Sequence, residues 1–586
     1  MRYQPRMRRS LALAALAVAA CASRAAAPRD LTTTSERSGW VKTGRHDETV
    51  RLCHDLAAAH PREARCEVFG TTPSGRPMVA VVLGRADLTA DAPVLFALAG
   101  IHAGEIDGKD AGFAFARDLL TGAVAPGALA RIRVVFVPTF NVDGHERFGP
   151  NHRPNQRGPE EMGFRTTATG LNLNRDFIKA DAPEMRALLA LWARWEPTLF
   201  VDLHATDAAK FEHDIAVMVA PKAGRGDDLE AAARALQARV LDRMTARGHL
   251  PLGFYPSFDE HDDPASGFTD GEAPPRFSHF YAAARDRLGV LVETHSWRPY
   301  RERVASTRAV LEELVAALVT DGAAWQRATR TAETTALAGR QVVLLSQGDP
   351  ARPREIEFRG YAYQRVPSEV SGGLWTQYDE TTPAIWRVPL RDQLIAAATV
   401  TAPKAGYVID GGWAAQVAPL LELHGIRWRA VADGARLDAE VWRLPKAELG
   451  RTVEGRTTVK VTGAWTREPR VVTRGAIYVP LDQPRARLIL HLLEPSAPDA
   501  LVAWGMWNAA FEQKEYMEGY VAEELARTML ADPAVKAAFD QALTDPAFAA
   551  SADRRLDWFY RRSPAWDERV GLIPVFRVDA APPAAP

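Results

Sequence analysis

The stretch Pro93-Val-Leu-Phe-Ala-Leu-Ala-Gly-Ile-His-Ala-Gly-Glu105 decides the fold. Its apolar first half, Pro93–Leu98, predicts a buried strand. Gly100 and Gly104 then permit a tight turn, and an amphipathic helix is expected over 108–120. The stretch therefore predicts a strand that passes through a turn into a helix.

The same alternation of strand and helix runs from about Asp47 to Thr320. Strands joined by crossover helices predict an α/β domain. Candidate strands are 78–83, 93–98, 131–138, 198–203, 215–219 and 289–292. Candidate helices are 108–120, 182–195, 228–247 and 303–322.

Polar residues follow three of these strands directly. The strand 93–98 leads into His102 and Glu105, the strand 198–203 into His204, and the strand 289–292 into Glu293. Ligands of open α/β sheets bind at the carboxyl ends of the strands, so these side chains are expected to converge. A helical turn would bring His102 and Glu105 to one face. Two histidines and a carboxylate are a ligand set for one zinc ion, and a further carboxylate can act as general base.

Five motifs occur in an order that resembles the zinc carboxypeptidases of the carboxypeptidase A type, across roughly residues 47–320. The resemblance implies a mixed-sheet α/β/α catalytic domain. The motifs are His102-x-x-Glu105, Pro138-Thr-Phe-Asn-Val-Asp-Gly144, Asn174-Arg175, Val201-Asp-Leu-His204 and Leu291-Val-Glu-Thr-His295.

The resemblance also implies a role for each residue. His102, Glu105 and His204 would hold the zinc, and Glu293 would be the general base. Asn174 and Arg175 would hold the terminal carboxylate of a peptide-like substrate, for which a guanidinium is a bidentate partner.

A second arginine is expected to stabilise the oxyanion. Arg165 and Arg157 are the candidates, with Arg165 preferred for this role and Arg157 kept as a substrate-binding residue.

The chain departs from the family's pattern at several positions. Val142 stands where proline is usual, and Asn172 stands where many members carry an aspartate that orients a ligand histidine. Tyr281 and Tyr255 are both open as the substrate-capping tyrosine. Because Asn172 accepts a hydrogen bond but carries no charge, the electronic properties of the ligand histidine are expected to differ from those in the family.

The length of 586 residues predicts two or three domains. The catalytic domain is expected over 40–325, a β-rich accessory domain over 335–495 and a helical region over 496–586. Alternating β-branched residues in 457–462 and 487–493 indicate strands, one helix is expected over 412–424, and the end from Ala580 is expected to fray. No motif in this half names a function.

The first 27 residues have the order of a signal peptide: a basic start, an apolar run over 11–20 and small residues. Two interpretations stay open, a lipobox ending at Cys21, which would carry a lipid anchor, and cleavage after Ala27. Export, to the periplasm, the membrane surface or the medium, is expected. Cys53 and Cys66 are expected to form a disulfide in such a compartment.

The formal net charge of −1 comes from 72 basic and 73 acidic residues, which argues against nucleic acid as a partner. The leading function is zinc-dependent removal of C-terminal residues from peptides. Hydrolysis of peptidoglycan stem peptides and deacylation of N-acyl amino acids are alternatives with the same chemistry. An inactive exported protein that binds zinc or peptide is the alternative from another class. The sequence does not predict the oligomeric state.

Overall fold

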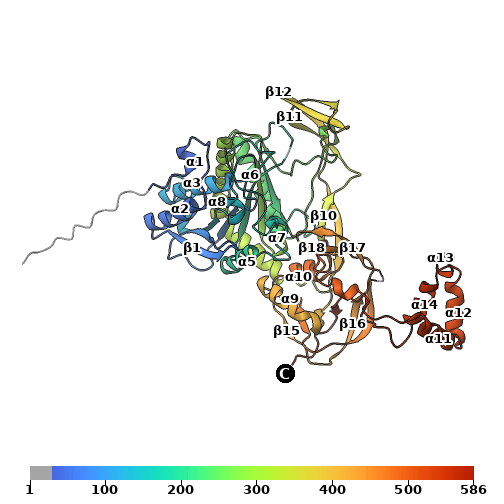
Figure 1. Ribbon diagram of the computed structural model, residues 1–586. Helices are drawn as coiled ribbons and strands as arrows, with labels where there is room; N and C mark the ends of the chain where they lie inside the picture. Colours follow the sequence, from blue (N-terminus) through green and yellow to red (C-terminus); the bar gives the residue numbers. More distant parts are fainter. Residues whose placement is uncertain (1–29, 208, 445) are drawn as a thin grey trace, which may run out of the picture.

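An eight-stranded mixed sheet lies at the centre of the first half of the chain in the computed structural model, which describes residues 30–207, 209–444 and 446–586 (Figure 1). The strand order is β1-β2-β4-β3-β5-β9-β6-β7, and β4, β3, β5 and β9 are parallel. The expected mixed-sheet α/β fold is confirmed. The strands are β1 (Ala64–Thr71), β2 (Pro77–Leu83), β3 (Val94–Ala99), β4 (Arg133–Val137), β5 (Leu199–Ala205), β6 (Ile215–Ala220), β7 (Pro251–Leu252) and β9 (Leu288–Thr294).

Alternate residues of the central strands point to opposite faces of this sheet, and each face has its own core. Leu95 and Val201 pack with α2, α3, α6 and α8 on one face, and Phe96 and Phe200 pack with α5 and α7 on the other. These helices are α2 (His46–Ala59), α3 (Asp107–Thr121), α5 (Pro183–Trp195), α6 (Asp228–Ala246), α7 (Ser278–Ala284) and α8 (Tyr300–Thr334). Shorter elements are α1 (Thr34–Arg37), η1 (Ala128–Ala130), α4 (Val142–Glu146), η2 (Leu173–Arg175) and η3 (Pro264–Ser266).

A disulfide joins Cys53 of α2 to Cys66 of β1, with a Cα–Cα distance of 5.2 Å. It ties the edge strand of the sheet to the first helix that covers it. The candidate lipid-bearing Cys21 and the signal segment lie outside the described residues. Among the residues that are described, no helix combines the length and apolar character needed to cross a bilayer.

Four strands of the next segment form an arm along the first domain. β10 (Gln341–Gly348) pairs with β13 (Leu394–Thr401), and β11 (Arg354–Pro367) forms a long hairpin with β12 (Leu374–Arg391). The base of this hairpin pairs with β8 (Phe268–Thr269), and its far end extends beyond the domain at the top of Figure 1.

A second sheet of six strands follows, in the order β15-β20-β14-β21-β16-β19. Strand β21 comes from near the end of the chain and lies between β14 and β16, so this sheet draws on both sides of the boundary expected at residue 495. Its strands are β14 (Gly406–Ile409), β15 (Arg429–Ala430), β16 (Arg436–Trp442), β19 (Trp465–Val471), β20 (Ile477–Pro480) and β21 (Val575–Val578). The end of the chain also pairs, through a bridge between Val431 and Ala584, instead of fraying.

Two helices and a hairpin accompany this sheet. The helix α9 (Gly411–Leu423) lies where it was expected, and the hairpin is formed by β17 (Glu448–Val453) and β18 (Arg456–Lys460). The expectation of a strand over 487–493 is wrong, because α10 (Ala486–Leu493) occupies it. A short run that is apolar on nearly every position does not distinguish a buried strand from a buried helix.

The helices of the tail form a small unit with its own core. Phe539, Phe548 and Phe559 pack together, and the unit stands apart at the right of Figure 1. The unit consists of α11 (Gly519–Met529), α12 (Pro533–Ala542), α13 (Pro546–Ala549) and α14 (Ala552–Tyr560). The short η4 (Asn508–Phe511) precedes it and packs against the large core of the second sheet.

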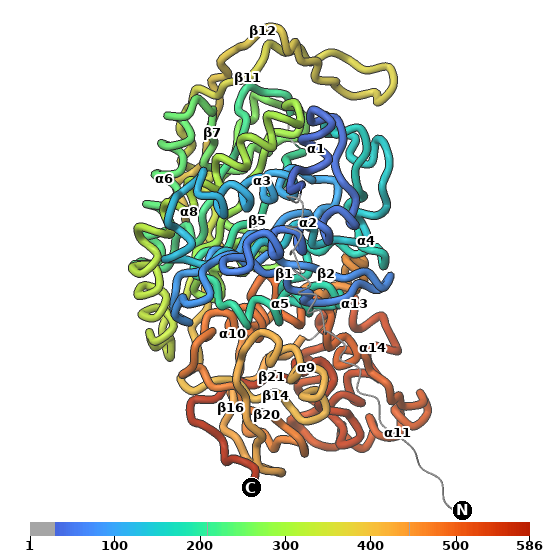
Figure 2. Tube along the Cα trace, turned by 90° about the vertical axis from the view of Figure 1, so that its left-hand side faces the viewer, coloured from blue at the N-terminus to red at the C-terminus, as the bar shows by residue number. Residues whose placement is uncertain are grey.

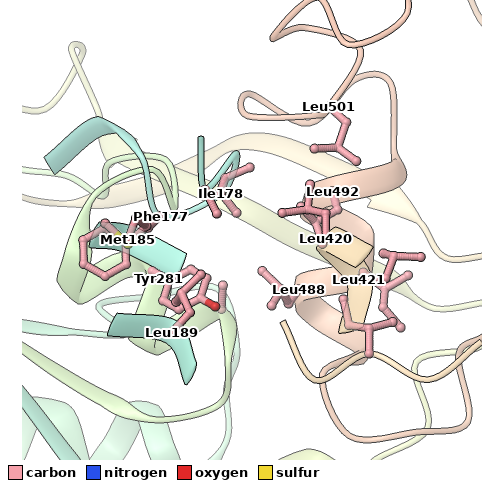
Figure 3. Packing of buried hydrophobic residues seen from close by; sticks show 14 of the residues in the cluster. Phe177, Ile178, Met185, Leu189, Tyr281, Leu420, Leu421, Leu488, Leu492 and Leu501 are labelled. Atoms are coloured by element: carbon pink, nitrogen blue, oxygen red, sulfur yellow. The ribbon is translucent and has the colours of Figure 1, made fainter. Parts of the chain in front are cut away.

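The second sheet packs directly beneath the first domain (Figure 2). One hydrophobic cluster runs through both, and Figure 3 shows its side chains facing one another across the interface. Those from the first domain are Phe177, Ile178, Met185, Leu189 and Tyr281, and those from the C-terminal region are Leu420, Leu421, Leu488, Leu492 and Leu501.

Candidate metal centre

The first two candidate ligands lie in the turn between β3 and α3. The backbone N–H of Glu105 donates to the carbonyl of His102 at 2.9 Å, which closes a single turn before the helix begins at Asp107. A Cβ at Gly104 would lie 2.5 Å from Cγ of Arg153, so glycine is required for this close approach. The local fold thus brings His102 and Glu105 to one side without a helix.

The third candidate ligand, His204, completes the group from β5. Nδ1 of His102 lies 2.9 Å from Oε1 of Glu105, and Nδ1 of His204 lies 2.9 Å from Oε2 of the same carboxylate. The three residues each offer a ligand atom within 4.8 Å of the others, and all three are buried. The convergence expected at the carboxyl ends of the strands is therefore present.

The remote nitrogen of each histidine faces a side-chain oxygen. Nε2 of His102 lies 3.1 Å from Oδ1 of Asn172, and Nε2 of His204 lies 2.7 Å from Oδ2 of Asp202. Such partners fix the ring orientation and leave Nδ1 free to bind a metal ion. Asp202 is two residues before His204 on the same strand, a spacing that places both on one face.

The protonation of His102 and Glu105 suits metal binding. Burial lowers the pKa of His102 to about 4, so its imidazole is neutral near pH 7. Burial would raise the pKa of Glu105, but His102 and Arg153 outweigh it and hold that pKa well below its ordinary value. A neutral imidazole and an ionised carboxylate are the forms that bind metal. At His204, burial would lower the pKa, but the charge of Asp202 and a hydrogen bond to it outweigh burial and raise that pKa well above its ordinary value, so a metal ion must displace a proton there. Two nitrogens and one carboxylate oxygen, with a position left for water, fit a catalytic zinc ion.

Glu293 lies beside this group on β9. It is the Cα partner of His204 across the parallel β5–β9 pair, so the two side chains lie on the same face of the sheet. Among the described residues, its buried Oε2 has no hydrogen-bond partner. Burial raises the pKa of Glu293 to about 8, against the opposing effect of His204. A carboxyl group is thus available next to the candidate ligands.

Of the two arginines expected near the ligands, one lies there and the other does not, and a third arginine is also present. Nη1 of Arg165 lies 3.5 Å from Glu105, as a candidate for oxyanion stabilisation should. Arg157 instead pairs with Glu380 of β12 at 2.9 Å, so the structure does not bring it to the ligands. Arg153 was not singled out from the sequence, yet its Nη2 lies 2.9 Å from Glu105. The sequence of its loop does not distinguish Arg153 from the other arginines nearby. Its position depends on the close approach to Gly104, which only the folded chain provides.

Asn174 and Arg175 lie in η2, on the Asn172 side of the ligand group. The guanidinium of Arg175 stacks over Phe277 at 4.1 Å and donates to the carbonyl of Asn174 at 2.7 Å. Burial, with the neighbouring charges of Arg165 and Arg276, lowers the pKa of Arg175 to about 10. Arg276 pairs with Asp499, and Arg165 lies close to Glu105, whereas Arg175 forms no ion pair with a carboxylate among the described residues. Its guanidinium is therefore available to bind an anion.

The two candidate tyrosines have separate places. Tyr281 is buried at the domain interface, where its hydroxyl lies 2.8 Å from Nδ1 of His424. Tyr255 lies near the ligands with its side chain partly exposed, and desolvation of its hydroxyl together with the charges of Glu293, Asp207 and Glu105 raises its pKa above the ordinary value.

A cavity of about 610 Å³ opens beside Asp207, which also pairs with Arg153 at 2.6 Å. The first domain contributes Phe258 and Trp297 to its lining, and the β11–β12 hairpin contributes Tyr378. Two parts of the chain therefore form the space next to the candidate metal centre.

The comparisons with known proteins agree with this site. Residues 49–216 match the model of the zinc carboxypeptidase family, less than a third of the chain, and this segment contains His102, Glu105 and His204. A search of curated proteins gave no match.

Solved structures of carboxypeptidases are similar to part of the chain. A metallo-carboxypeptidase from Burkholderia cenocepacia is 16% identical, with 46% of this chain and 69% of that chain covered and a TM-score of 0.35. One from Pseudomonas aeruginosa, in complex with (2-guanidinoethylmercapto)succinic acid, is 17% identical over 46% and 68%, with a TM-score of 0.34. Carboxypeptidase A from Helicoverpa armigera is 14% identical over 48% and 74%, with a TM-score of 0.35.

Proposed function

We propose that the protein is an exported zinc metallocarboxypeptidase that removes C-terminal residues from peptides or peptide-like amides. The observation that carries this proposal is the convergence of His102, Glu105 and His204 beside the unpartnered carboxyl oxygen of Glu293. The family match over residues 49–216 supports the same class of enzyme.

A bound zinc ion would act as a Lewis acid and acidify a water molecule, and His102, Glu105 and His204 would hold it. Oε2 of Glu293 takes the proton of the attacking water and then returns it to the leaving nitrogen as the C–N bond breaks. Water thus supplies the hydroxyl of the new carboxylate and one proton of the released amine.

The arginines have two tasks in this reaction. Arg153 and Arg165 are both close enough to Glu105 to stabilise the negative charge that develops on the carbonyl oxygen. Arg175, with Asn174, binds the free carboxylate of the substrate, because a guanidinium pairs bidentately with it. The remainder of the substrate fits the cavity beside Asp207.

The place of action that we propose is outside the cytoplasm. The N-terminal segment has the order of a signal peptide, and the pair Cys53–Cys66 is a disulfide, which persists in oxidising compartments. Ordinary peptides and peptidoglycan stem peptides both occur there, and both end in the carboxylate that Arg175 would bind.

The test is release of C-terminal amino acids from a mixed peptide set, with zinc content measured for each protein. Glu293→Gln should keep zinc and fold, yet lose nearly all turnover, because the amide does not accept the proton of water. Glu272→Gln removes a half-buried carboxyl that accepts hydrogen bonds from the backbone of Lys222 and Ser346, and it should keep the activity of the wild type.

If the wild type holds zinc but trims no peptide, peptidoglycan fragments and N-acyl amino acids are the next substrates. If it hydrolyses none of the three, or if Glu293→Gln is fully active, the proposed function is wrong.

A further inference from the structure

The tip of the β17–β18 hairpin reaches the loop that carries Asn172. Oε2 of Glu454 accepts a hydrogen bond from the backbone N–H of Asn172 at 2.8 Å. Glu454 is half-buried and adopts a positive φ of 49°, and the next residue, Gly455, lies against Leu171. A residue of the C-terminal region thus contacts the first domain 282 positions away in sequence.

The hairpin is fixed in this place by contacts on both sides. Arg456 donates two hydrogen bonds to the carboxylate of Asp181, at 2.6 and 2.7 Å. Behind the tip, Val459 donates a backbone hydrogen bond to the carbonyl of Ala503 at 3.1 Å. A bidentate arginine pair holds its partner with defined geometry, so the position of Glu454 is set by its neighbours.

Asn172 passes this contact on to a candidate ligand. Its side-chain Oδ1 lies 3.1 Å from Nε2 of His102 and accepts from the backbone N–H of Asn174 at 3.0 Å. Nδ1 of the same imidazole faces Glu105. Glu454 is therefore linked to His102 through Asn172: one hydrogen bond joins Glu454 to the Asn172 backbone, and a second joins the Asn172 side chain to the imidazole. The metal-binding nitrogen, Nδ1, is on the other side of that ring.

We propose that Glu454 is a positioning residue that holds His102 in its metal-binding orientation through Asn172, and that the C-terminal region in this way takes part in the metal centre. The inference rests on the proposed function. Asn172 accepts a hydrogen bond from His102 but carries no charge, and Glu454 supplies a negative charge on that side of the ring. Orienting groups beyond the ligands raise the affinity of a site for its metal.

The test compares Glu454→Ala, the milder Glu454→Gln and a control, Glu448→Ala. The control removes a carboxylate from the same hairpin, at a position where it pairs with exposed Lys460. Zinc affinity is measured by competition with a chromophoric chelator, and the cobalt-substituted proteins are compared by visible absorption. Glu454→Ala should weaken zinc binding about tenfold and shift the cobalt spectrum, and Glu454→Gln should weaken it less, about threefold. Glu448→Ala should match the wild type.

A double-mutant cycle with Asn172→Ala tests whether Glu454 acts through Asn172. If Glu454 acts through Asn172, the substitution Glu454→Ala should cost little further zinc affinity once the amide of Asn172 is absent. An equal loss in both backgrounds, or an unchanged zinc affinity in Glu454→Ala and Glu454→Gln, overturns the inference.

A rise in KM with unchanged zinc affinity would also overturn it, because Glu454 would then act on Arg175 and the substrate carboxylate. A wild type that binds no zinc would refute the proposed function instead, so the two failures are distinguishable.

Discussion

The two faces of the eight-stranded sheet are covered in different ways. On one face, α2, α3, α6 and α8 close the core with residues of the first 328 positions alone. On the other face, the core around α5 and α7 continues into α9, α10 and the second sheet. The comparison teaches that the first domain is complete on one side only, and that the C-terminal region supplies the other side.

Charged side chains also join the first domain to the C-terminal region. Arg485, just before α10, pairs with Glu196 at 2.7 Å and also contacts Glu333, while Arg287 of the first domain pairs with the same two carboxylates. Both arginines are almost fully buried. The interface is thus a hydrophobic core with an internal ion-pair network, as within a domain.

The largest effect is expected from ending the chain at residue 335. Removal of the C-terminal region would expose Phe177, Met185 and Tyr281, which are fully buried in the whole chain. A large exposed apolar surface leads to aggregation. We expect the fragment to be insoluble or to bind a hydrophobic dye, measured by yield and by dye fluorescence.

A matched deletion removes α11–α14 and joins residue 515 to residue 562. This unit has its own core, so the deletion should leave the remaining chain soluble and folded. A soluble, well-folded 30–335 fragment would break the comparison between the two faces.

A smaller effect is expected from single substitutions in the two cores. Leu421→Ala in the shared core and Leu314→Ala in the local core both remove a fully buried side chain. Each should cost about 2–5 kcal/mol of unfolding free energy, because a cavity remains. In denaturant titrations both variants should lower the midpoint of the same transition. A separate early transition in Leu421→Ala alone would show that the C-terminal region unfolds independently.

The smallest effect is a pH dependence of the interface. His424 is buried between Tyr281 and the carbonyl of Ile178, and burial, with the charge of Arg285, lowers its pKa to about 3. The unfolded chain therefore binds a proton below pH 6.5 that the folded chain does not. The stability from neutral His424 is complete above that pH and is lost as the pH falls towards 3, by up to about 2 kcal/mol at pH 5.

Thermal unfolding between pH 7 and pH 5 tests this prediction. His424→Gln should lose less stability over that range than the wild type, because glutamine does not titrate. His54→Gln, at an exposed position of α2, should follow the wild type. Identical pH profiles for all three proteins would contradict the role of His424.

The sequence predicted the sheet and the candidate ligands because both depend on local pattern. When an apolar strand of a parallel sheet ends in a polar residue, as at His204 and Glu293, that residue lies at the carboxyl end of the sheet, whatever segment follows it. The same logic places Asp202, two positions earlier on the strand, beside His204. The α/β fold and the family resemblance can accordingly be predicted from the sequence alone.

The remaining features depend on contacts between distant segments. Arg153 reaches Glu105 only because Gly104 leaves room, and Glu454 reaches Asn172 only because the second sheet packs under the first domain. The strand β21 is short, and its position between β14 and β16 is a property of the whole sheet. No pattern of neighbouring residues encodes such pairings.

The most direct test of the account is the zinc content of the purified chain after dialysis, measured by elemental analysis for the wild type, His204→Ala and His145→Gln. His145 is buried but bonds the carbonyl of Gly44, outside the ligand group. The account predicts one zinc ion per chain in the wild type and in His145→Gln, and close to none in His204→Ala. A wild type without zinc, or a full zinc ion in His204→Ala, would contradict it.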